Sequence, residues 1–384
     1  MVALSHSPLL FLGQGALAIA VSFGIARYGF GLFLPDMAAD FGLTNAELGA
    51  ISSGAYLGYF ASSIVAMTLT VRTGARIMLL TGLGLATAGM ILIATAKSAP
   101  MLVIGCVLAG ASPGLVFSPI SEAISILFGQ DDQGPAFSTM NAGEGLGAVL
   151  SAVVFLLLVD WQTSWALFAA LGLASTLGVL FLVPGRAQRD AQSEPITKML
   201  WLPHGDAKAL LLGSFVLGVT TTVFWTFAGA LVDGQSMSIF GKMVQMRTLL
   251  WIILGLAGTA GVVAAPLLRY LGLKSTYMLA IFATGAALCL SGLATDTKTF
   301  VLMSGGVFGF AYIMATSQLG AWAMTIYAAR PSSGFGLTFL IFSVGAVIGP
   351  IVAGSLAEQI GLGSTFIAAG LMTLGNLSCL PGSK

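Results

Sequence analysis

Helix-length apolar stretches follow one another along almost the whole chain, and this pattern restricts the fold more than any other feature. A helix needs about 20 mostly apolar residues to cross a bilayer. Of the 384 residues 57% are hydrophobic and only 8% are charged, whereas roughly a quarter of the residues of a soluble domain are charged. The stretches are continuous and do not alternate as the strands of a transmembrane β-barrel do. The sequence therefore predicts an all-α membrane protein.

Twelve transmembrane helices are expected. The first six fall near 9–35, 45–70, 75–96, 100–127, 135–158 and 163–183. The second six fall near 209–232, 246–268, 275–295, 299–328, 333–357 and 363–380. Thr44 and Glu47 form a capping box, which marks the start of the second span, and Pro35 is expected to close the first.

The two sets of six spans read as copies of each other. A shift of 198 residues places Gly147-Ala148-Val149 on Gly345-Ala346-Val347, and Gly172 on Gly370. Internal repeats around a site near the bilayer midplane are typical of secondary transporters. We predict two pseudo-symmetric six-helix bundles over residues 1–184 and 208–384, joined by a charged linker over 185–207.

The lysines and arginines of the loops predict the orientation of the chain. The side that holds the linker and both termini collects Arg72, Arg76, Arg186, Arg189, Lys198, Lys208, Arg269, Lys274, Arg330 and Lys384, against Lys97, Lys242, Arg247 and Lys298 on the other side. We therefore expect both termini and the linker in the cytoplasm. The net charge of +1 gives no reason to expect nucleic acid as a partner.

Arg27 is a single guanidinium inside the first apolar stretch. A charge at the centre of a membrane helix costs about 2.5–3.5 kcal/mol, so it is expected to face the bundle interior or a water-filled cavity. The arginine fork suits a planar carboxylate or phosphate. Arg27, with Tyr28 beside it, is therefore a candidate for binding an anionic substrate, although snorkelling to the interface is the structural alternative. For Arg247, at the start of the eighth span, snorkelling is the preferred interpretation.

Glu144 is the second charge predicted at membrane depth, near the middle of the fifth span. It could serve as a buried counter-ion that holds Arg27 in place. It could equally load and release a proton during transport, since intramembrane carboxyl groups form proton relays. Both roles remain open, and a proton on Glu144 would release Arg27 for a substrate.

The chain resembles the major facilitator superfamily over nearly its whole length. Arg72, Gly74 and Arg76 fit half of the motif that this family carries between its second and third spans, and Gly110-Ala111-Ser112-Pro113-Gly114 fits its fourth. The segment Ala26-Arg27-Tyr28-Gly29-Phe30 is similar to a poorly characterised bacterial branch, the YbfB/YjiJ-like transporters. The resemblance implies alternating access in a bacterial inner or plasma membrane, with spans one, four, seven and ten lining the cavity.

Two further sets of residues gain expected roles from this resemblance. Thr221 and Trp225 in the seventh span, with Tyr312 and Gln318 in the tenth, would line the cavity wall; a hydroxyl can also simply bond to its own helix. Glu122 would pair with Arg72 or Arg76 and close a cytoplasmic gate. A solvated acid at a helix end is the simpler alternative for Glu122.

These residues favour a secondary active carrier for a small organic anion, coupled to protons. The first alternative is proton-driven efflux of amphipathic compounds, and an alternative of another class is a transporter-like sensor without turnover. The sequence has no Walker loop, and its two histidines, His6 and His204, lie in polar flanks. We therefore expect no enzyme activity, no cofactor and no metal, and a monomer whose partners are the bilayer, a small-molecule substrate and H⁺.

Overall fold

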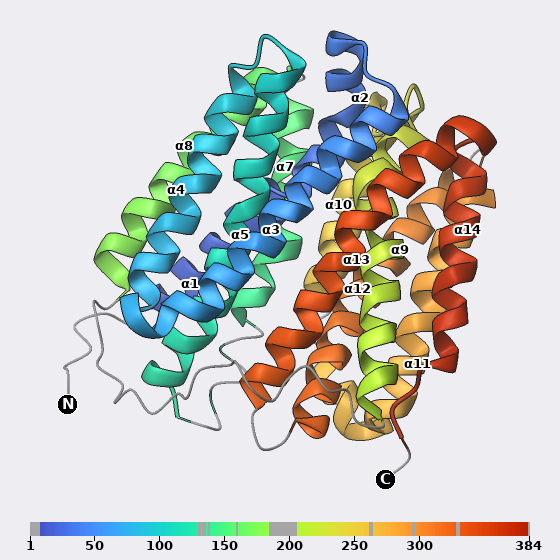
Figure 1. Ribbon diagram of the computed structural model, residues 1–384. Helices are drawn as coiled ribbons and strands as arrows, with labels where there is room; N and C mark the ends of the chain where they lie inside the picture. Colours follow the sequence, from blue (N-terminus) through green and yellow to red (C-terminus); the bar gives the residue numbers. More distant parts are fainter. Residues whose placement is uncertain are drawn as a thin grey trace. The chain divides into compact units, whose positions relative to one another are not determined.

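The computed structural model describes residues 8–129, 132, 136, 139–158, 160–183, 206–260, 264–293, 297–327 and 331–382. Within these residues the chain consists of helices, their connecting turns and one short β-hairpin (Figure 1). The expected all-α class is confirmed. Almost all of the predicted linker over 185–207 lies outside the described residues, so the division of the chain at that linker stays a prediction.

The helices before the linker are α1 (Pro8–Ile19), the π-helical segment η1 (Ala20–Ile25), α2 (Gly29–Phe41), α3 (Asn45–Thr73), α4 (Ala75–Ala94), α5 (Ala99–Leu127), α7 (Gly143–Leu158) and α8 (Trp161–Leu182). The elements after it are α9 (Asp206–Leu231), β1 (Ser236–Ile239), β2 (Lys242–Gln245), α10 (Met246–Ala260), α11 (Ala264–Leu293), α12 (Lys298–Ile326), α13 (Pro331–Ile360), α14 (Leu362–Gly375) and the 3₁₀ turn η4 (Asn376–Ser378). Each of the twelve predicted spans coincides with a helical segment.

Length and hydropathy agree with a membrane protein. Among the described residues, ten helical segments are long and apolar enough to cross a bilayer, and α10 is a shorter apolar helix. The segment called α11 contains a break at Gly272, whose φ of 76° is not helical. Residues 264–271 therefore belong to the predicted eighth span, and the ninth span starts after Gly272.

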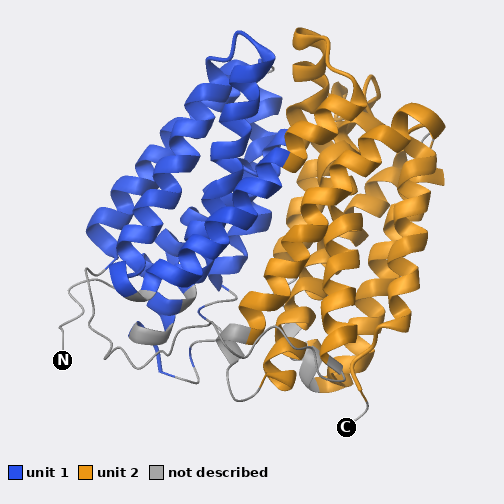
Figure 2. Cartoon of the chain, viewed as in Figure 1, with its two compact units in different colours: residues 1–30, 54–191 blue, residues 31–53, 192–384 orange. Residues whose placement is uncertain are grey.

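The described chain groups into two compact units (Figure 2). Unit 1 contains residues 1–30 and 54–191, and unit 2 contains residues 31–53 and 192–384. Residues 31–53 comprise α2, from its third residue, and the start of α3. By sequence they belong to the first predicted half, but by packing they belong with the helices of the second.

The first span is not a continuous α-helix. The backbone N–H of Ala26 donates to the carbonyl of Val21 at 2.8 Å, and that of Tyr28 donates to Phe23 at 3.0 Å. Both bonds join residues five apart, which is the π-helical pattern, and such segments frequently occur at functional sites. Residues 26–28 form a turn before α2 begins at Gly29. Arg27 therefore lies at an interruption of the helix.

One predicted helix boundary is confirmed and one is wrong. The Thr44 backbone N–H donates to the Glu47 carboxylate at 2.8 Å, and the Glu47 N–H donates to the Thr44 hydroxyl at 3.3 Å, which is the expected capping box. Pro35 does not close the first span, since α2 continues through it to Phe41. A proline is tolerated inside a membrane helix where neighbouring groups compensate for the lost hydrogen bond.

Close helix contacts in unit 1 depend on glycine. A Cβ atom on Gly24 of η1 would lie 2.5 Å from the Cα atom of Gly147 in α7, and one on Gly147 would overlap the carbonyl oxygen of Ala20. Small residues let membrane helices approach this closely. The packing holds η1, and with it Arg27, against the start of α7, where Glu144 lies.

Unit 2 repeats these helix pairs, with its glycines at the predicted offset. Gly345 of α13, the repeat counterpart of Gly147, meets the backbone of Phe215 in α9, and Figure 1 shows α9 beside α13. Likewise Gly172 of α8 packs on Thr87 of α4, while Gly370 of α14 packs on α11. The predicted internal repeat therefore has a counterpart in the packing within each unit.

Candidate functional site

Arg27 lies in a cluster of aromatic rings within unit 1. Its Cζ atom lies 4.4 Å from the ring centroid of Tyr59, 4.6 Å from Tyr56, 5.2 Å from Tyr28 and 5.5 Å from Phe23. Only 8% of Arg27 is exposed. Each ring face attracts a guanidinium by about 0.5–2 kcal/mol, more when water is excluded. The cluster, which we call the Arg27 cage, surrounds the cation with side chains of unit 1.

Two helices supply this cage. Phe23, Arg27 and Tyr28 come from η1 and the turn after it, and Tyr56 and Tyr59 come from α3. Tyr56 and Tyr59 are three residues apart and therefore share one face of α3. Both tyrosines also interact electrostatically with the Arg27 guanidinium. The cage thus combines ring faces with hydroxyl groups.

Glu144 lies beside this cage. It is 6% exposed and lies within electrostatic range of both Tyr28 and Arg27. It occupies the first turn of α7, directly after a turn at Ala142. The sequence placed it near the middle of a continuous helix, whereas its carboxylate lies where the helix dipole favours a negative charge. Its Oε1 atom has no hydrogen-bond partner among the described residues.

Sequence reasoning singled out Arg27, Tyr28 and Glu144 but missed Phe23, Tyr56 and Tyr59. The available signal was the Tyr-x-x-Tyr spacing in the second span, since two tyrosines on one face at membrane depth need polar partners for their hydroxyls. Gly58, which lies between them, packs on the backbone of Val107 in α5. That contact holds this stretch of α3 within unit 1.

The predicted wall residues of the second half form an aromatic cluster in unit 2. Trp225 of α9 lies 5.5 Å from Tyr312 of α12, and Phe308 stacks on Phe224 at 3.9 Å and on Tyr312 at 5.9 Å between ring centroids. Trp225 and Tyr312 are both 5% exposed. The structure therefore brings together these two residues, which the sequence selected on separate helices.

The two other wall residues are buried. The Thr221 hydroxyl donates to the carbonyl of Leu217 in its own helix at 2.6 Å, which is the structural role that the sequence left open. Gln318 is 1% exposed, and its Oε1 atom has no hydrogen-bond partner among the described residues. An uncompensated buried amide oxygen costs about 1–3 kcal/mol. Gln318 is thus a better candidate for contact with a polar ligand than Thr221.

The three predicted gate residues all lie in unit 1. Arg72 ends α3, Arg76 lies in the first turn of α4, and Glu122 lies near the end of α5. The Arg76 guanidinium donates to the backbone carbonyl of Leu180 in α8. The expected pairing of Glu122 with Arg72 or Arg76 stays a prediction.

Arg247 does not snorkel to an interface, and that interpretation was wrong. Its side chain is 5% exposed and pairs with Asp36 of α2 at 2.8 Å, while its Nε donates to Gln245 at 2.7 Å. The hydropathy of the span gave no sign of Asp36 as a partner. A carboxylate from a distant helix holds the cation inside unit 2.

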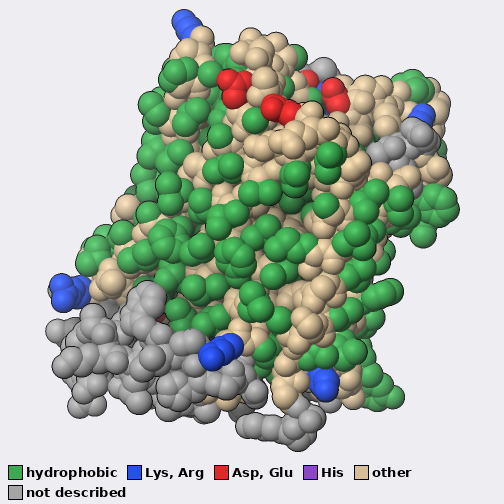
Figure 3. All heavy atoms as spheres, turned by 45° about the vertical axis from the view of Figure 1, so that its right-hand side comes forward, with side chains coloured by type: hydrophobic (Ala, Val, Ile, Leu, Met, Phe, Trp, Pro, Cys, Tyr) green, Lys and Arg blue, Asp and Glu red, His purple; other side chains and the backbone are tan. Residues whose placement is uncertain are grey.

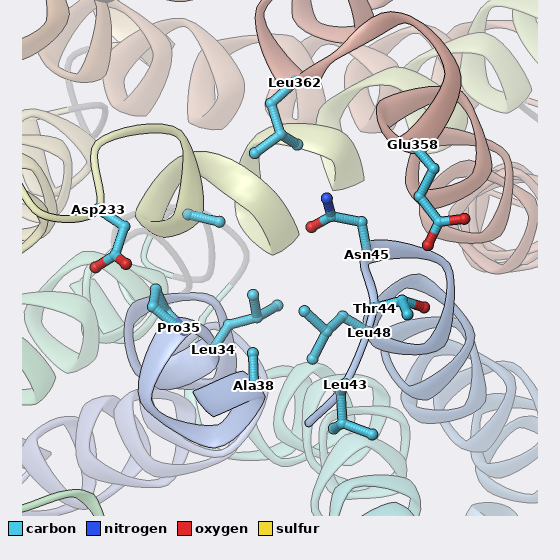
Figure 4. A pocket seen from close by; sticks show the side chains of 11 residues that line it. Leu34, Pro35, Ala38, Leu43, Thr44, Asn45, Leu48, Asp233, Glu358 and Leu362 are labelled. Atoms are coloured by element: carbon cyan, nitrogen blue, oxygen red, sulfur yellow. The ribbon is translucent and has the colours of Figure 1, made fainter. Parts of the chain in front are cut away.

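Unit 2 also contains a cavity of about 500 Å³ (Figure 4). Its lining is mostly apolar, with two carboxylates: Leu34, Pro35, Ala38, Leu43, Thr44, Asn45, Leu48, Ala230, Asp233, Glu358 and Leu362. Glu358 accepts a hydrogen bond from the backbone of Ala46 at 2.9 Å. Figure 3 shows acidic side chains gathered at one end of the face that it displays.

The sequence matches the family described as the uncharacterised MFS-type transporter YbfB over residues 19–379. The chain belongs to this family of the major facilitator superfamily. Its helices agree with that fold in solved structures. The nucleoside transporter NupG superposes with a TM-score of 0.75 at 15% identity and covers 97% of this chain and 98% of its own. A POT family transporter in complex with 5-aminolevulinic acid gives 0.75 at 14% identity, covering 96% of this chain and 94% of its own.

A similar curated protein is monocarboxylate transporter 11 of Mus musculus. It is 25% identical over 367 residues, which cover 89% of this chain and 79% of that transporter. A shorter match of 141 residues, at 23% identity, relates 37% of this chain to 31% of the probable hexose phosphate transport protein of Chlamydia muridarum. The matched family and relatives are transporters, so the chain is a multi-pass integral membrane protein of transporter type.

Proposed function

We propose that this chain is a secondary active carrier for a small organic anion with a carboxylate group. Transport proceeds by alternating access and is coupled to H⁺. The observation that carries the proposal is the Arg27 cage with Glu144 beside it, because a cation and an acid are buried together in one unit. The name of the similar monocarboxylate transporter 11 supports a carboxylate substrate.

In this proposal Arg27 binds the carboxylate, and its five donors in a planar fork fit the two oxygens of that group. Glu144 competes with the substrate for Arg27 while it is charged. A proton on Glu144 removes that competition, so proton and anion bind together. Tyr28, which lies near Glu144 and contacts Arg27, positions both groups.

Within the C-terminal half, Trp225, Tyr312, Gln318 and Thr221 provide further contacts for the substrate. Arg72, Arg76 and Glu122 form a gate at the cytoplasmic side, where both termini lie. The Arg27 cage is buried, and the cluster that contains Trp225 and Tyr312 is aromatic. The substrate therefore meets few competing charges at either place.

The test is uptake of a panel of carboxylates into proteoliposomes, with and without a pH gradient, against protein-free liposomes. A hydrogen bond to a charged group contributes about 1.5–3 kcal/mol, so Arg27→Ala should weaken anion affinity about 10- to 150-fold. Arg27→Lys should recover only part of it, because a lysine lacks the fork. Lys97→Ala, which removes an exposed cation of unit 1, is the control and should transport as the unaltered chain does.

Two results would overturn the proposal. Flux of hydrophobic cations without flux of any carboxylate would favour proton-driven efflux of amphipathic compounds. A folded, reconstituted protein that moves no compound under any gradient would favour a sensor without turnover.

A further inference from the structure

The charges buried in unit 1 restrict what its site can accept. Among the described residues of this unit, the buried charged side chains are Arg27 and Glu144. A ligand with one carboxylate satisfies one guanidinium, but a second carboxylate would be buried without a cation, which is strongly unfavourable. The site therefore favours a monocarboxylate over a dicarboxylate.

The surroundings of Arg27 restrict the remainder of the ligand. The rings of Phe23, Tyr28, Tyr56 and Tyr59 are each 7% exposed or less, and they lie within 5.5 Å of the guanidinium carbon. Apart from the tyrosine hydroxyls and Glu144, the side chains of the Arg27 cage carry few groups that could form hydrogen bonds with a ligand. A sugar acid would lose the hydration of several hydroxyl groups without replacement, whereas an apolar tail would lose none.

Phe117, which lies next to this cage, is less buried than the rings of the cage. Phe117 of α5 lies 5.5 Å from Phe23 between ring centroids and is half-buried, in contrast to the buried rings of the cage. Phe23 thus contacts both Arg27 and Phe117. A flat ligand can place its charged end at Arg27 and its ring against Phe117, since aromatic pairs favour centroid separations of 4.5–7 Å.

We infer that the substrate is a flat, ring-bearing monocarboxylate, bound with its carboxylate at Arg27 and its ring against Phe23 and Phe117. The inference rests on the proposed function and narrows its substrate class. Phe117 is then a specificity-determining residue, and it selects planar over puckered acids of equal size.

The test is equilibrium binding to the purified full-length chain in detergent, measured by calorimetry with four probes. Benzoate and cyclohexanecarboxylate match in size but differ in flatness, butyrate lacks a ring, and terephthalate adds a second carboxylate. Each aromatic contact contributes about 0.5–1.5 kcal/mol, so benzoate should bind roughly 2- to 12-fold more tightly than cyclohexanecarboxylate. Terephthalate should bind more weakly than benzoate. Phe117→Leu should lower the benzoate-to-cyclohexanecarboxylate ratio, with the Phe23 contact retained, and leave butyrate unchanged.

Phe181→Leu is the matched control, because Phe181 is 72% exposed on α8 in the same unit. Equal or tighter binding of cyclohexanecarboxylate or butyrate, still dependent on Arg27, would overturn this inference and leave the proposed function intact. Absence of binding by every carboxylate would overturn both. An unchanged ratio in Phe117→Leu would remove the role of Phe117, and if that variant does not fold, the ratio in the unaltered chain decides the question.

Discussion

The contact of α2 with the helices of the second half depends on the pair of Asp36 and Arg247. The pair joins Oδ1 to Nη2 at 2.8 Å, with Arg247 5% and Asp36 30% exposed. A hydrogen bond of 2.8 Å between Ser52 of α3 and Thr226 of α9 adds a second contact between residues 31–53 and the rest of unit 2. In the alternating-access cycle that we propose, residues 31–53 would separate from α9, α10 and α13 at one stage. We therefore predict that Asp36→Ala favours the separated state.

The size of this effect follows from the burial of the two partners. An exposed ion pair contributes about 0.2–1 kcal/mol, and removal of one partner from a buried pair costs about 3–5 kcal/mol. Asp36 is partly exposed, so water screens the pair and an intermediate cost of about 1–3 kcal/mol applies. That cost corresponds to a shift of roughly 5- to 150-fold in the equilibrium between packed and separated states.

The assay is the rate at which a membrane-impermeant maleimide labels Ala38→Cys, a cavity-lining position, in a background without Cys106, Cys289 and Cys379. Asp36→Ala should accelerate labelling by the calculated factor, and the charge exchange of Asp36→Arg with Arg247→Asp should partly restore the slow rate. Asp233→Ala, which removes an exposed acid from the same cavity, is the control. Labelling within twofold of the unaltered rate in Asp36→Ala, or a coupling energy near zero in the double-mutant cycle, would refute the reasoning.

Three further predictions concern separate parts of the chain. Glu144→Gln should abolish accumulation driven by a pH gradient, which for one proton per anion is about tenfold per pH unit, while anion exchange without a gradient persists; retained accumulation would contradict the proton role. Gly147→Leu should cost at least about 1–3 kcal/mol, because its side chain would overlap the Ala20 carbonyl, whereas Gly84→Leu, with open space around it, should keep its melting temperature. Asp160→Ala should cost about 0.5–2 kcal/mol by loss of the helix cap on Thr163. Because the Thr163 hydrogen bonds lower the Asp160 pKa, that contribution should be present at neutral pH and vanish as the pH falls through this pKa, so thermal unfolding of the variant and the unaltered chain should converge in acid.

Much of the fold could be predicted from sequence, because hydropathy is a local property. A run of about 20 apolar residues excludes most alternatives to a membrane helix, and each expected span has its helix in the structure. The capping box of Thr44 and Glu47 was equally predictable, since its two hydrogen bonds join residues three apart. Pro35 misled the prediction, because the local rule for a helix end ignores what neighbouring helices supply.

The candidate site was predictable in its two charged members and in Tyr28, which follows Arg27 in the chain. Arg27 and Glu144 stand out because an ionised group at membrane depth is costly wherever its partner lies. Tyr56 and Tyr59 did not stand out, since a tyrosine in a membrane helix carries no comparable cost, and only the contact of α3 with the turn at Arg27 gives them a role.

The sequence by itself determined the membrane class, the places of the helices in the described residues and the two buried charges of unit 1. The tertiary structure alone decided that η1 breaks the first span, that Asp36 pairs with Arg247 and that residues 31–53 pack with the second half. The physical reason is the separation along the chain of the residues that interact. Apolar burial and capping act on residues close in the chain, whereas ion pairs and ring contacts join side chains from distant helices, and their partners become defined only when those helices pack.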